Sequence, residues 1–183
     1  MALYKDIHKK IDDIIVRPLK PSDYNEWLLG YENQLDSKSK YDEGKIDTSF
    51  LTKQWYEINL LERNTMAEKD DCYLFNIFRV EDGASIGNCD ITTHMRGDFQ
   101  YARVGYTIHN QYWNNGYATK ALKALINIGI NDLNFHRLEA HINLDNMVSK
   151  RVAINAGMEF ECIRKSFILE DGVWTDNEIY YIS

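Results

Sequence analysis

The sequence predicts a single domain of the α/β class, α+β in arrangement, with a mixed, mostly antiparallel twisted sheet of about seven strands flanked by about four helices. Apolar residues recur at helical spacing over residues 118–129, whereas inward and outward side chains alternate over residues 101–109. A run of aromatic and β-branched residues at 73–80 ends at Glu81-Asp82-Gly83, which is typical of a hairpin turn. The 183 residues suffice for one hydrophobic core.

The N-terminal part combines a charged segment, a short strand and a helix. Residues 1–12 are expected to form a polar arm ahead of a domain that spans residues 13–183. Residues 14–17 are expected to form the first strand, which ends because the next residue is a proline. Ser22 is expected to cap a helix whose apolar stripe runs through residues 24–31.

The later elements follow in an order that fits one mixed sheet with helices packed on it. No internal repeat or low-complexity segment divides the chain. In chain order we expect a loop over 36–48, a helix from about 51 to 64, strands at 73–80, 86–94 and 102–108, a helix at 118–129, a strand at 136–142, a helix at 146–156, and a closing hairpin of 158–169 with 173–182.

Charge and cysteine content exclude several classes of protein. The formal net charge is −7, and binding to nucleic acid or to an anionic membrane depends on Lys and Arg, so neither partner is expected. Cys72, Cys89 and Cys162 are widely spaced without a Cys-x-x-Cys pair, so we expect reduced thiols and no metal site. Because no signal-peptide pattern and no apolar run of about 18 residues occurs, we expect a cytoplasmic protein.

The segment from Tyr112 to Thr119 lies between a predicted strand and the amphipathic helix that follows it. A helix start leaves backbone N–H groups unpaired and bears a positive partial charge, so it can hold a diphosphate without basic side chains. Asn114, Asn115 and Gly116 suit this role because Gly and Asn tolerate positive φ best, which lets successive N–H groups converge. An ordinary polar loop is the alternative for this segment by itself.

A second segment, Asn146-x-x-Ser149, lies where the next predicted strand ends and the next helix begins. By itself it fits an Asn that caps a helix with Ser in the first turn. Together, the two segments make a more specific pattern than either one alone.

The ordered set of motifs resembles the GCN5-related N-acetyltransferase (GNAT) superfamily, and within it the branch that acetylates the N-termini of ribosomal proteins. The resemblance spans nearly the whole chain. The family loop Q/R-x-x-G-x-G/A falls on residues 113–118, so Trp113 and Asn114 depart from the pattern and only the backbone contacts carry over. The markers are Ile15-Val16-Arg17-Pro18-Leu19 with Ser22-Asp23, Gly105-Tyr106-Thr107-Ile108, residues 112–122, Asn146-Met147-Val148-Ser149 and Asn155-Ala156-Gly157-Met158.

The resemblance implies acetyl-CoA as the cosubstrate, held at two places. The pantetheine arm is expected in a gap between two separating strands, with the Ile108 N–H facing the thioester and with Asn146 and Ser149 bonding the arm from the other side. The strand before the loop would supply Thr107, Ile108 and His109, and the diphosphate would lie on Asn114, Asn115, Gly116, Tyr117, Ala118 and Thr119.

Acetyl transfer needs a neutral amine, a stabilised oxyanion and a proton for the departing thiolate. The branch commonly has Glu where this chain has Arg103, so Asp90 on the preceding strand is the candidate base, directly or through water, with His94 behind it. A solvated carboxylate is the alternative for Asp90. Relatives outside the branch have Tyr where this chain has Ala153, so Ser149 or solvent is the candidate proton donor.

The main hypothesis is an acetyl-CoA-dependent N-acetyltransferase that transfers acetyl directly, in a ternary complex, to the α-amine at a protein or peptide N-terminus. Such an amine has a reference pKa of about 7.7–8.0 and demands little of a base, whereas Lys at about 10.4 is rarely neutral. The alternatives are a small acceptor, such as a polyamine or an aminoglycoside, and a non-catalytic acyl-CoA sensor. A homodimer is a further open point.

Overall fold

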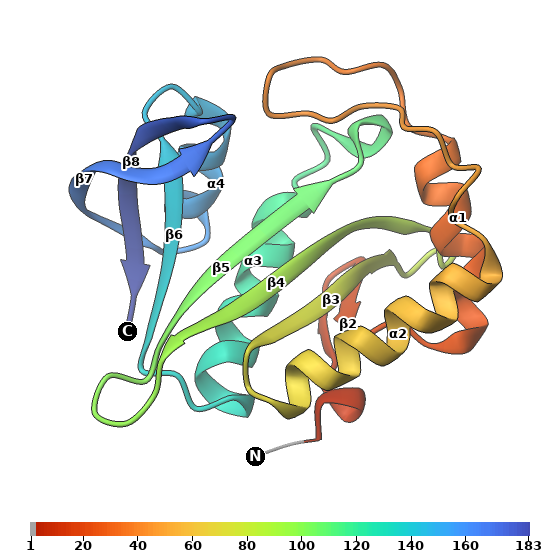
Figure 1. Cartoon of the computed structure of the whole chain (residues 1–183), viewed down its shortest axis with the longest axis horizontal. Helices are drawn as coiled ribbons and strands as arrows, with labels where there is room; N and C mark the ends of the chain where they lie inside the picture. Colours follow the sequence, from red (N-terminus) through yellow and green to blue (C-terminus); the bar gives the residue numbers. More distant parts are fainter. Residues whose placement is uncertain (1–2) are drawn as a thin grey trace.

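The computed structural model describes residues 3–183, which form one eight-stranded sheet in the order β1-β2-β3-β4-β5-β6-β8-β7 (Figure 1). Every neighbouring pair is antiparallel except β5 and β6. The predicted mixed, mostly antiparallel sheet is therefore confirmed. The strands are β1 Lys9–Ile11, β2 Ile14–Arg17, β3 Cys72–Arg79, β4 Ser85–Met95, β5 Tyr101–Ile108, β6 Arg137–Asn143, β7 Glu159–Glu170 and β8 Val173–Ile182, and the α-helices are α1 Tyr24–Glu32, α2 Lys53–Glu68, α3 Tyr117–Asn127 and α4 Met147–Asn155.

The N-terminal segment differs from the expected polar arm over residues 1–12, of which the structure describes 3–12. Lys9–Ile11 forms the edge strand β1 and pairs with β2. Ile7 is buried in the core, and Ile11 packs against it from its partly exposed position. Burial of these two apolar side chains stabilises the segment against the sheet, while the charged ends of the neighbouring lysines stay in water.

The first helix also begins differently from the expectation. Ser22 lies inside a short 3₁₀ turn, Pro21–Asp23, and does not cap α1. Asp23 orders this corner instead, because its carboxylate accepts hydrogen bonds from the Lys20 backbone N–H at 2.8 Å and from the Arg17 guanidinium at 2.6 Å. The ion pair therefore joins the end of β2 to the start of the helix.

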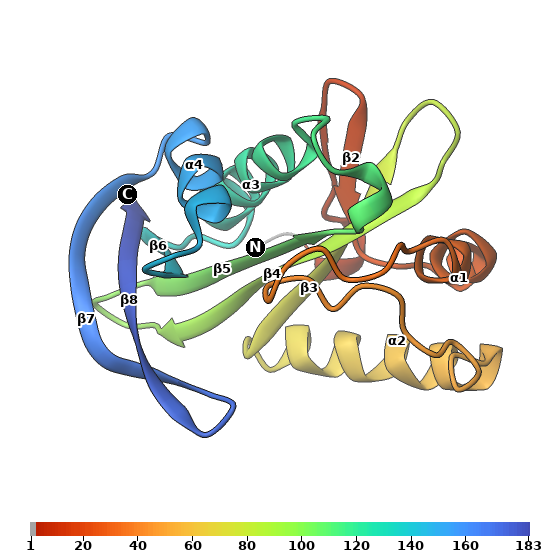
Figure 2. The ribbon, with the colours of Figure 1, turned by 90° about the horizontal axis from the view of Figure 1, so that it is seen from above.

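Two layers of helices sandwich the sheet (Figure 2). Strand alternation directs Phe75 and Ile91 to the face covered by α3, where both are fully buried. Phe78 lies in a second cluster with Trp27 of α1 and Tyr56 of α2. The sheet thus has an α1/α2 face and an α3/α4 face, and none of the helices within residues 3–183 has the length and apolarity that a membrane crossing needs.

Candidate active site

The parallel strands β5 and β6 stay together for only three residue pairs. Tyr101–Arg103 pairs with Arg137–Glu139, after which the strands separate (Figure 1). A cavity of about 220 Å³ lies where they part, and Arg103, Tyr106, His141 and Ser149 are among the residues that line it. The predicted gap between two strands therefore exists.

Backbone groups of β5 point into this gap. The His109 N–H donates to the carbonyl of Ile86 in the neighbouring strand β4 at 2.9 Å. Because backbone groups alternate in direction along a strand, the N–H groups of Ile108 and Tyr106 point the opposite way, toward β6. The Ile108 carbonyl accepts from Trp113 Nε1 at 2.7 Å. The Ile108 N–H, which points toward β6, is a donor beside the gap. The Ile108 N–H therefore faces the side of β5 on which β6 has separated.

The loop between β5 and α3 has the backbone that its sequence predicts. Asn114 and Gly116 adopt positive φ angles of 66° and 73°. Gly116 directly precedes α3, whose first N–H groups have no partners inside the helix. The Asn115 side chain donates to the carbonyls of Tyr112 and Trp113, both at 3.0 Å, so it braces the loop and does not point outward.

Ser149 and Asn146 lie together at the start of α4. Asn146 Oδ1 accepts from the Ser149 N–H at 3.1 Å, which makes Asn146 a genuine helix cap. Ser149 Oγ shares a hydrogen bond of 2.8 Å with the Tyr106 hydroxyl from across the gap. Burial raises the pKa of Tyr106 to about 12. Tyr106 is a site residue that the sequence reasoning named only as a motif marker, although its inward position in the alternation of β5 could have identified it.

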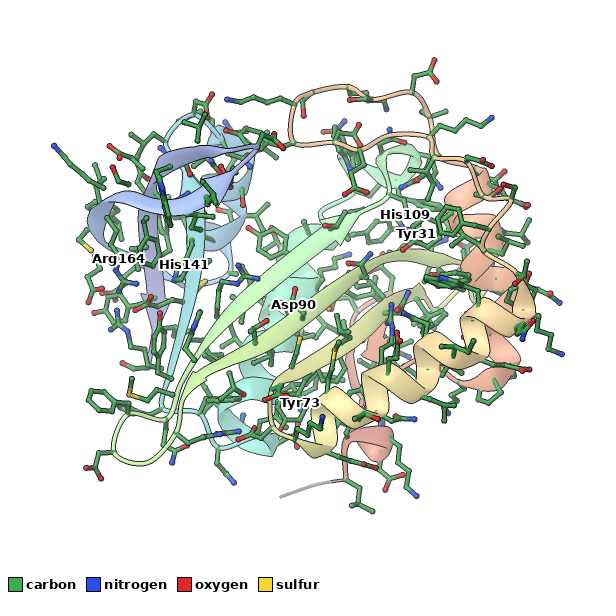
Figure 3. All side chains as sticks on the ribbon, in the orientation of Figure 1. Tyr31, Tyr73, Asp90, His109, His141 and Arg164 are labelled. Atoms are coloured by element: carbon green, nitrogen blue, oxygen red, sulfur yellow. The ribbon has the colours of Figure 1, made fainter. Side chains whose placement is uncertain are left out.

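Asp90 lies on the other face of the sheet, the α1/α2 face, near the centre of the molecule (Figure 3). It is opposite Gly105, and a Cβ built on Gly105 would lie 2.3 Å from Asp90 Oδ1, so the missing side chain makes room for the carboxylate. Burial raises the pKa of Asp90, against a hydrogen bond from Thr92 and the charge of Arg103. The two candidate proton-transfer groups, Asp90 and Ser149, are thus on opposite faces of the gap.

A buried carboxylate, Glu139, fastens the point where β5 and β6 part, and sequence reasoning missed it. Its side chain is 2% exposed and accepts from Tyr101 at 2.6 Å, Arg137 at 2.8 Å, His141 at 2.9 Å and Arg164 at 3.0 Å. Burial alone would raise the pKa of Glu139, but these hydrogen bonds hold it well below its usual value. No sequence motif marks the cluster, because its members come from β5, β6 and β7.

Two of the predicted cofactor contacts, Thr107 and His109, pair with β4 through their backbones. The His109 ring is buried against α1, where its Nδ1 donates to the Gly30 carbonyl at 2.8 Å and the ring packs at a tilt against Tyr31 (Figure 3). Burial lowers the pKa of His109 to about 4. Its Nδ1 and its backbone N–H are engaged, whereas its buried Nε2 has no hydrogen-bond partner among residues 3–183. Thr107 pairs with β4 through its backbone and exposes its side chain on the α1/α2 face.

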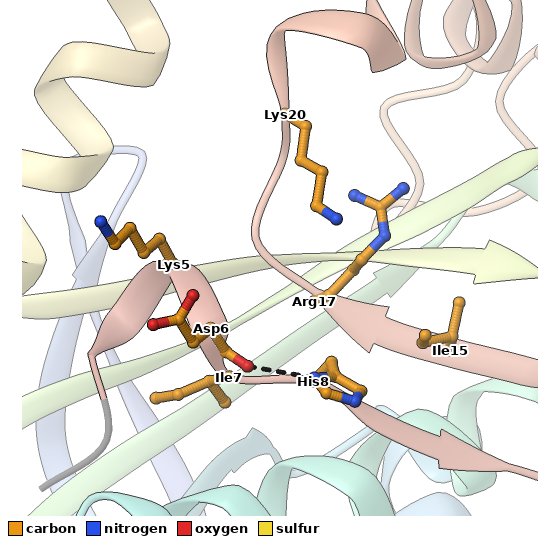
Figure 4. A pocket seen from close by; sticks show the side chains of 7 residues that line it. All are labelled: Lys5, Asp6, Ile7, His8, Ile15, Arg17 and Lys20. Atoms are coloured by element: carbon orange, nitrogen blue, oxygen red, sulfur yellow. Dashed lines mark hydrogen bonds between the residues drawn. The ribbon is translucent and has the colours of Figure 1, made fainter.

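A larger hollow, of about 440 Å³, lies between the N-terminal turn and β2 and is lined by Lys5, Arg17 and Lys20 (Figure 4). The Arg17 guanidinium is already paired with Asp23. We place the site at the smaller cavity, because backbone donors of β5, the start of α4 and partly buried polar side chains converge there. Within residues 3–183 no group of three or more His, Cys, Asp or Glu side chains is arranged to hold a metal ion.

The loop between α1 and α2 reaches across the top of the gap (Figure 1). Lys40 and Tyr41 both contact Asp145, which lies between β6 and α4. At its other end, the Asn110 side chain exchanges hydrogen bonds of 2.8 Å with the backbone of Leu35. The loop therefore bridges the two sides of the gap.

Comparisons with known proteins give one consistent result. A family model described as an acetyltransferase (GNAT) domain matches residues 13–159. The chain is 29% identical over 169 residues, 92% of its length and 93% of the relative's, to a Bacillus subtilis protein named Probable N-acetyltransferase YjcK. It is 26% identical, over 72% of its length and 68% of the relative's, to the [Ribosomal protein uS5]-alanine N-acetyltransferase of Escherichia coli.

Solved structures share the fold. The ribosomal-protein-S5-alanine acetyltransferase of Vibrio fischeri has a TM-score of 0.74 at 20% identity and covers 97% of this chain and 96% of its own. RimJ of Mycobacterium smegmatis, in complex with CoA-disulfide, has a TM-score of 0.73 at 21% identity, with 92% and 81% covered.

Proposed function

Because the chain belongs to the acetyltransferase (GNAT) family and is an N-acetyltransferase, we propose that it transfers the acetyl group of acetyl-CoA to the α-amine at a protein or peptide N-terminus. One observation carries the donor half of the proposal. The gap between β5 and β6 lies beside a loop with positive φ at Asn114 and Gly116, so backbone donors for a thioester and for a diphosphate occur together.

Hydrogen-bond donors for an extended cosubstrate would come from three segments of the chain. The loop and the first turn of α3, from Asn114 to Thr119, would hold the diphosphate through backbone N–H groups. The Ile108 N–H and the Asn146–Ser149 segment would hold the pantetheine arm from its two sides. The cavity between them supports this fit, because Tyr106 and Ser149 from opposite sides of the gap meet in it at 2.8 Å.

The reaction divides between the two faces of the sheet. Bound acetyl-CoA supplies an activated acetyl carbon in the gap. On the α1/α2 face, Asp90 accepts the proton that the attacking amine loses, directly or through water, and its raised pKa makes it a stronger base than an exposed aspartate. In the gap, the Ile108 N–H stabilises the oxyanion, and Ser149, held by Tyr106, passes a proton to the departing thiolate.

Amine basicity and the name of one relative favour an N-terminal α-amine as the acceptor. An N-terminal α-amine is partly neutral near pH 7.5, so it makes small demands on a partly buried carboxylate such as Asp90. The relative from Escherichia coli carries the name of an N-terminal alanine acetyltransferase of a ribosomal protein. Both points favour a protein or peptide N-terminus over a lysine side chain or a polyamine.

Thiol release from acetyl-CoA tests the proposal when it is measured with a panel of peptides and small amines. We expect turnover with peptides that have a free N-terminus and none with the same peptides after N-terminal blocking. Blocked peptides that retain a lysine are the control for side-chain acetylation. Faster turnover with spermidine or an aminoglycoside than with every peptide would contradict the proposed acceptor, and tight acetyl-CoA binding without any turnover would contradict catalysis.

A further inference from the structure

Arg103 occupies a distinctive place in the gap. It is the last residue of β5 that pairs with β6, where it lies opposite Glu139, and it lines the cavity. Strand pairing puts its side chain opposite Thr92 on β4, on the same face as Asp90. An amine that approaches Asp90 from the α1/α2 face therefore passes beside the guanidinium.

The Arg103 side chain has no polar partner within residues 3–183. Its Nε is buried without a hydrogen bond, and the guanidinium makes no ion pair with any of the described residues. The nearby carboxylates are engaged elsewhere, since Glu139 accepts from Arg137 and Arg164 and Asp90 accepts from Thr92 at 2.9 Å. A buried Nε donor without an acceptor is costly unless a ligand supplies one.

We propose that Arg103 binds an oxygen next to the acceptor's amine, either the carboxylate of a free amino acid or the first carbonyl of a peptide. The acceptor is then an α-amino acid or an α-amino acyl N-terminus, because these place an oxygen two bonds from the carbon that bears the amine. This inference rests on the proposed acetyl transfer, assigns a residue to acceptor recognition, and adds free α-amino acids to the acceptors that the site can hold.

The local charge agrees with an oxygen-bearing acceptor. Although the chain has a net charge of −7, Arg137 and Arg164 together neutralise Glu139 at the base of the gap, and Arg103 adds a further positive charge. A polyamine would bring only cations to this place and would leave the guanidinium unpaired. Rejection of such acceptors follows from the same contact that selects amino acyl groups.

Matched acceptors and an Arg103→Met variant test the proposal. The acceptors are L-alanine, L-alaninamide, an alanine-initiated tripeptide, and ethylamine, which is alanine without its carboxylate. We expect the variant to lose about 10- to 100-fold in kcat/KM for whichever carbonyl- or carboxylate-bearing acceptors the wild type uses, and less than about 2-fold for ethylamine. The ratio for each acceptor cancels the differences in amine pKa.

The two sources of the oxygen separate in the same assay. A larger loss in the variant for L-alanine identifies a carboxylate, and a larger loss for the amide or the tripeptide identifies a carbonyl. Lys69→Met removes an exposed cation at the end of α2 and should leave every rate unchanged. An equal loss on all four acceptors in the Arg103 variant would overturn the proposal, because Arg103 would then act through Asp90 or through the fold.

A binding measurement keeps the test independent of turnover. With CoA present, N-acetyl-L-alanine and N-acetyl-L-alaninamide, which carry the two proposed oxygens, are titrated calorimetrically into the wild type and the variant. Binding of either by the wild type, weakened about 10-fold or more in Arg103→Met, supports the assignment even if no amine is acetylated and the proposed function fails. Equal binding by both proteins, or no binding of either compound by the wild type, overturns it.

Discussion

Replacing Glu139 with glutamine keeps the side-chain shape but removes a negative charge that several donors share. The carboxylate is 2% exposed, whereas the side chains of Arg137 and Arg164 are 25% and 32% exposed. In the variant, an amide NH₂ group faces at least one of these cations, and the amide oxygen can replace only part of the lost acceptor capacity. The variant should therefore destabilise the region where β5 and β6 separate.

The expected loss of unfolding free energy follows from the burial of the partners. Removing one partner of a fully buried ion pair costs about 3–5 kcal/mol. Because both arginines are partly exposed and can recover water, we discount this to about 2–3 kcal/mol. At about 2–4 °C per kcal/mol for a chain of this size, the melting temperature of Glu139→Gln should fall by about 4–12 °C.

Urea unfolding at several pH values tests both the magnitude and its cause. The folded-state pKa of Glu139 lies below its ordinary value of 4.5, so its contribution is fully present above about pH 5 and declines as the pH falls toward the folded-state pKa. The difference between wild type and Glu139→Gln should therefore shrink in acid. Glu161→Gln is the matched control, because Glu161 pairs with the same Arg137 at 2.5 Å but is 37% exposed, and it should cost less than about 1 kcal/mol.

Equal stability of wild type and Glu139→Gln at pH 7 would refute this reasoning. So would a difference that stays constant from pH 7 into the acid range, because the effect would then come from packing and not from the ionised carboxylate.

Further predictions concern the gap itself. Gly116→Ala meets no atom within 4 Å but must keep a φ of 73°, so we expect a cost of about 1 kcal/mol and about fivefold weaker acetyl-CoA binding by calorimetry; unchanged binding would argue against the loop. Asp90→Asn should lower kcat and abolish the decline of activity in acid, since a base with a raised pKa loses function as it protonates; an unaltered pH profile would reject Asp90 as the base. Gly105→Ala should reduce kcat while the protein stays folded by circular dichroism, because the new Cβ displaces the Asp90 carboxylate; wild-type kcat would show that Asp90 tolerates displacement. Tyr106→Phe and Ser149→Ala each remove the same hydrogen bond, so their effects on the KM for acetyl-CoA should be less than additive, and full additivity would indicate separate roles.

Local patterns in the sequence predicted most of the fold because each depends on near neighbours. The alternation along β5 and the stripe of α3 both match the structure. The turn at Gly83, with a φ of 74°, lies where Glu81-Asp82-Gly83 indicates a hairpin. Short elements were harder to predict, since the three residues of β1 are too few for a periodic pattern and are ordered by tertiary contacts.

The backbone features of the candidate site could be predicted from the sequence. Positive φ at Asn114 and Gly116 follows from residue type, and the direction of the Ile108 N–H follows from strand alternation. The Glu139 cluster was not predictable, because it joins three strands that are distant in the sequence. The position of His109 in the sequence, beside the gap, does not reveal that its ring turns toward α1.

Amide hydrogen exchange with and without acetyl-CoA tests the central claim, that the gap between β5 and β6 and the adjoining loop hold the donor. We predict slower exchange at the amides of Tyr106 and Ile108 and across residues 114–119 when acetyl-CoA is present, with no change around Lys5 and Lys20. Protection at the basic hollow of Lys5 and Lys20, with none in the gap, would contradict the account.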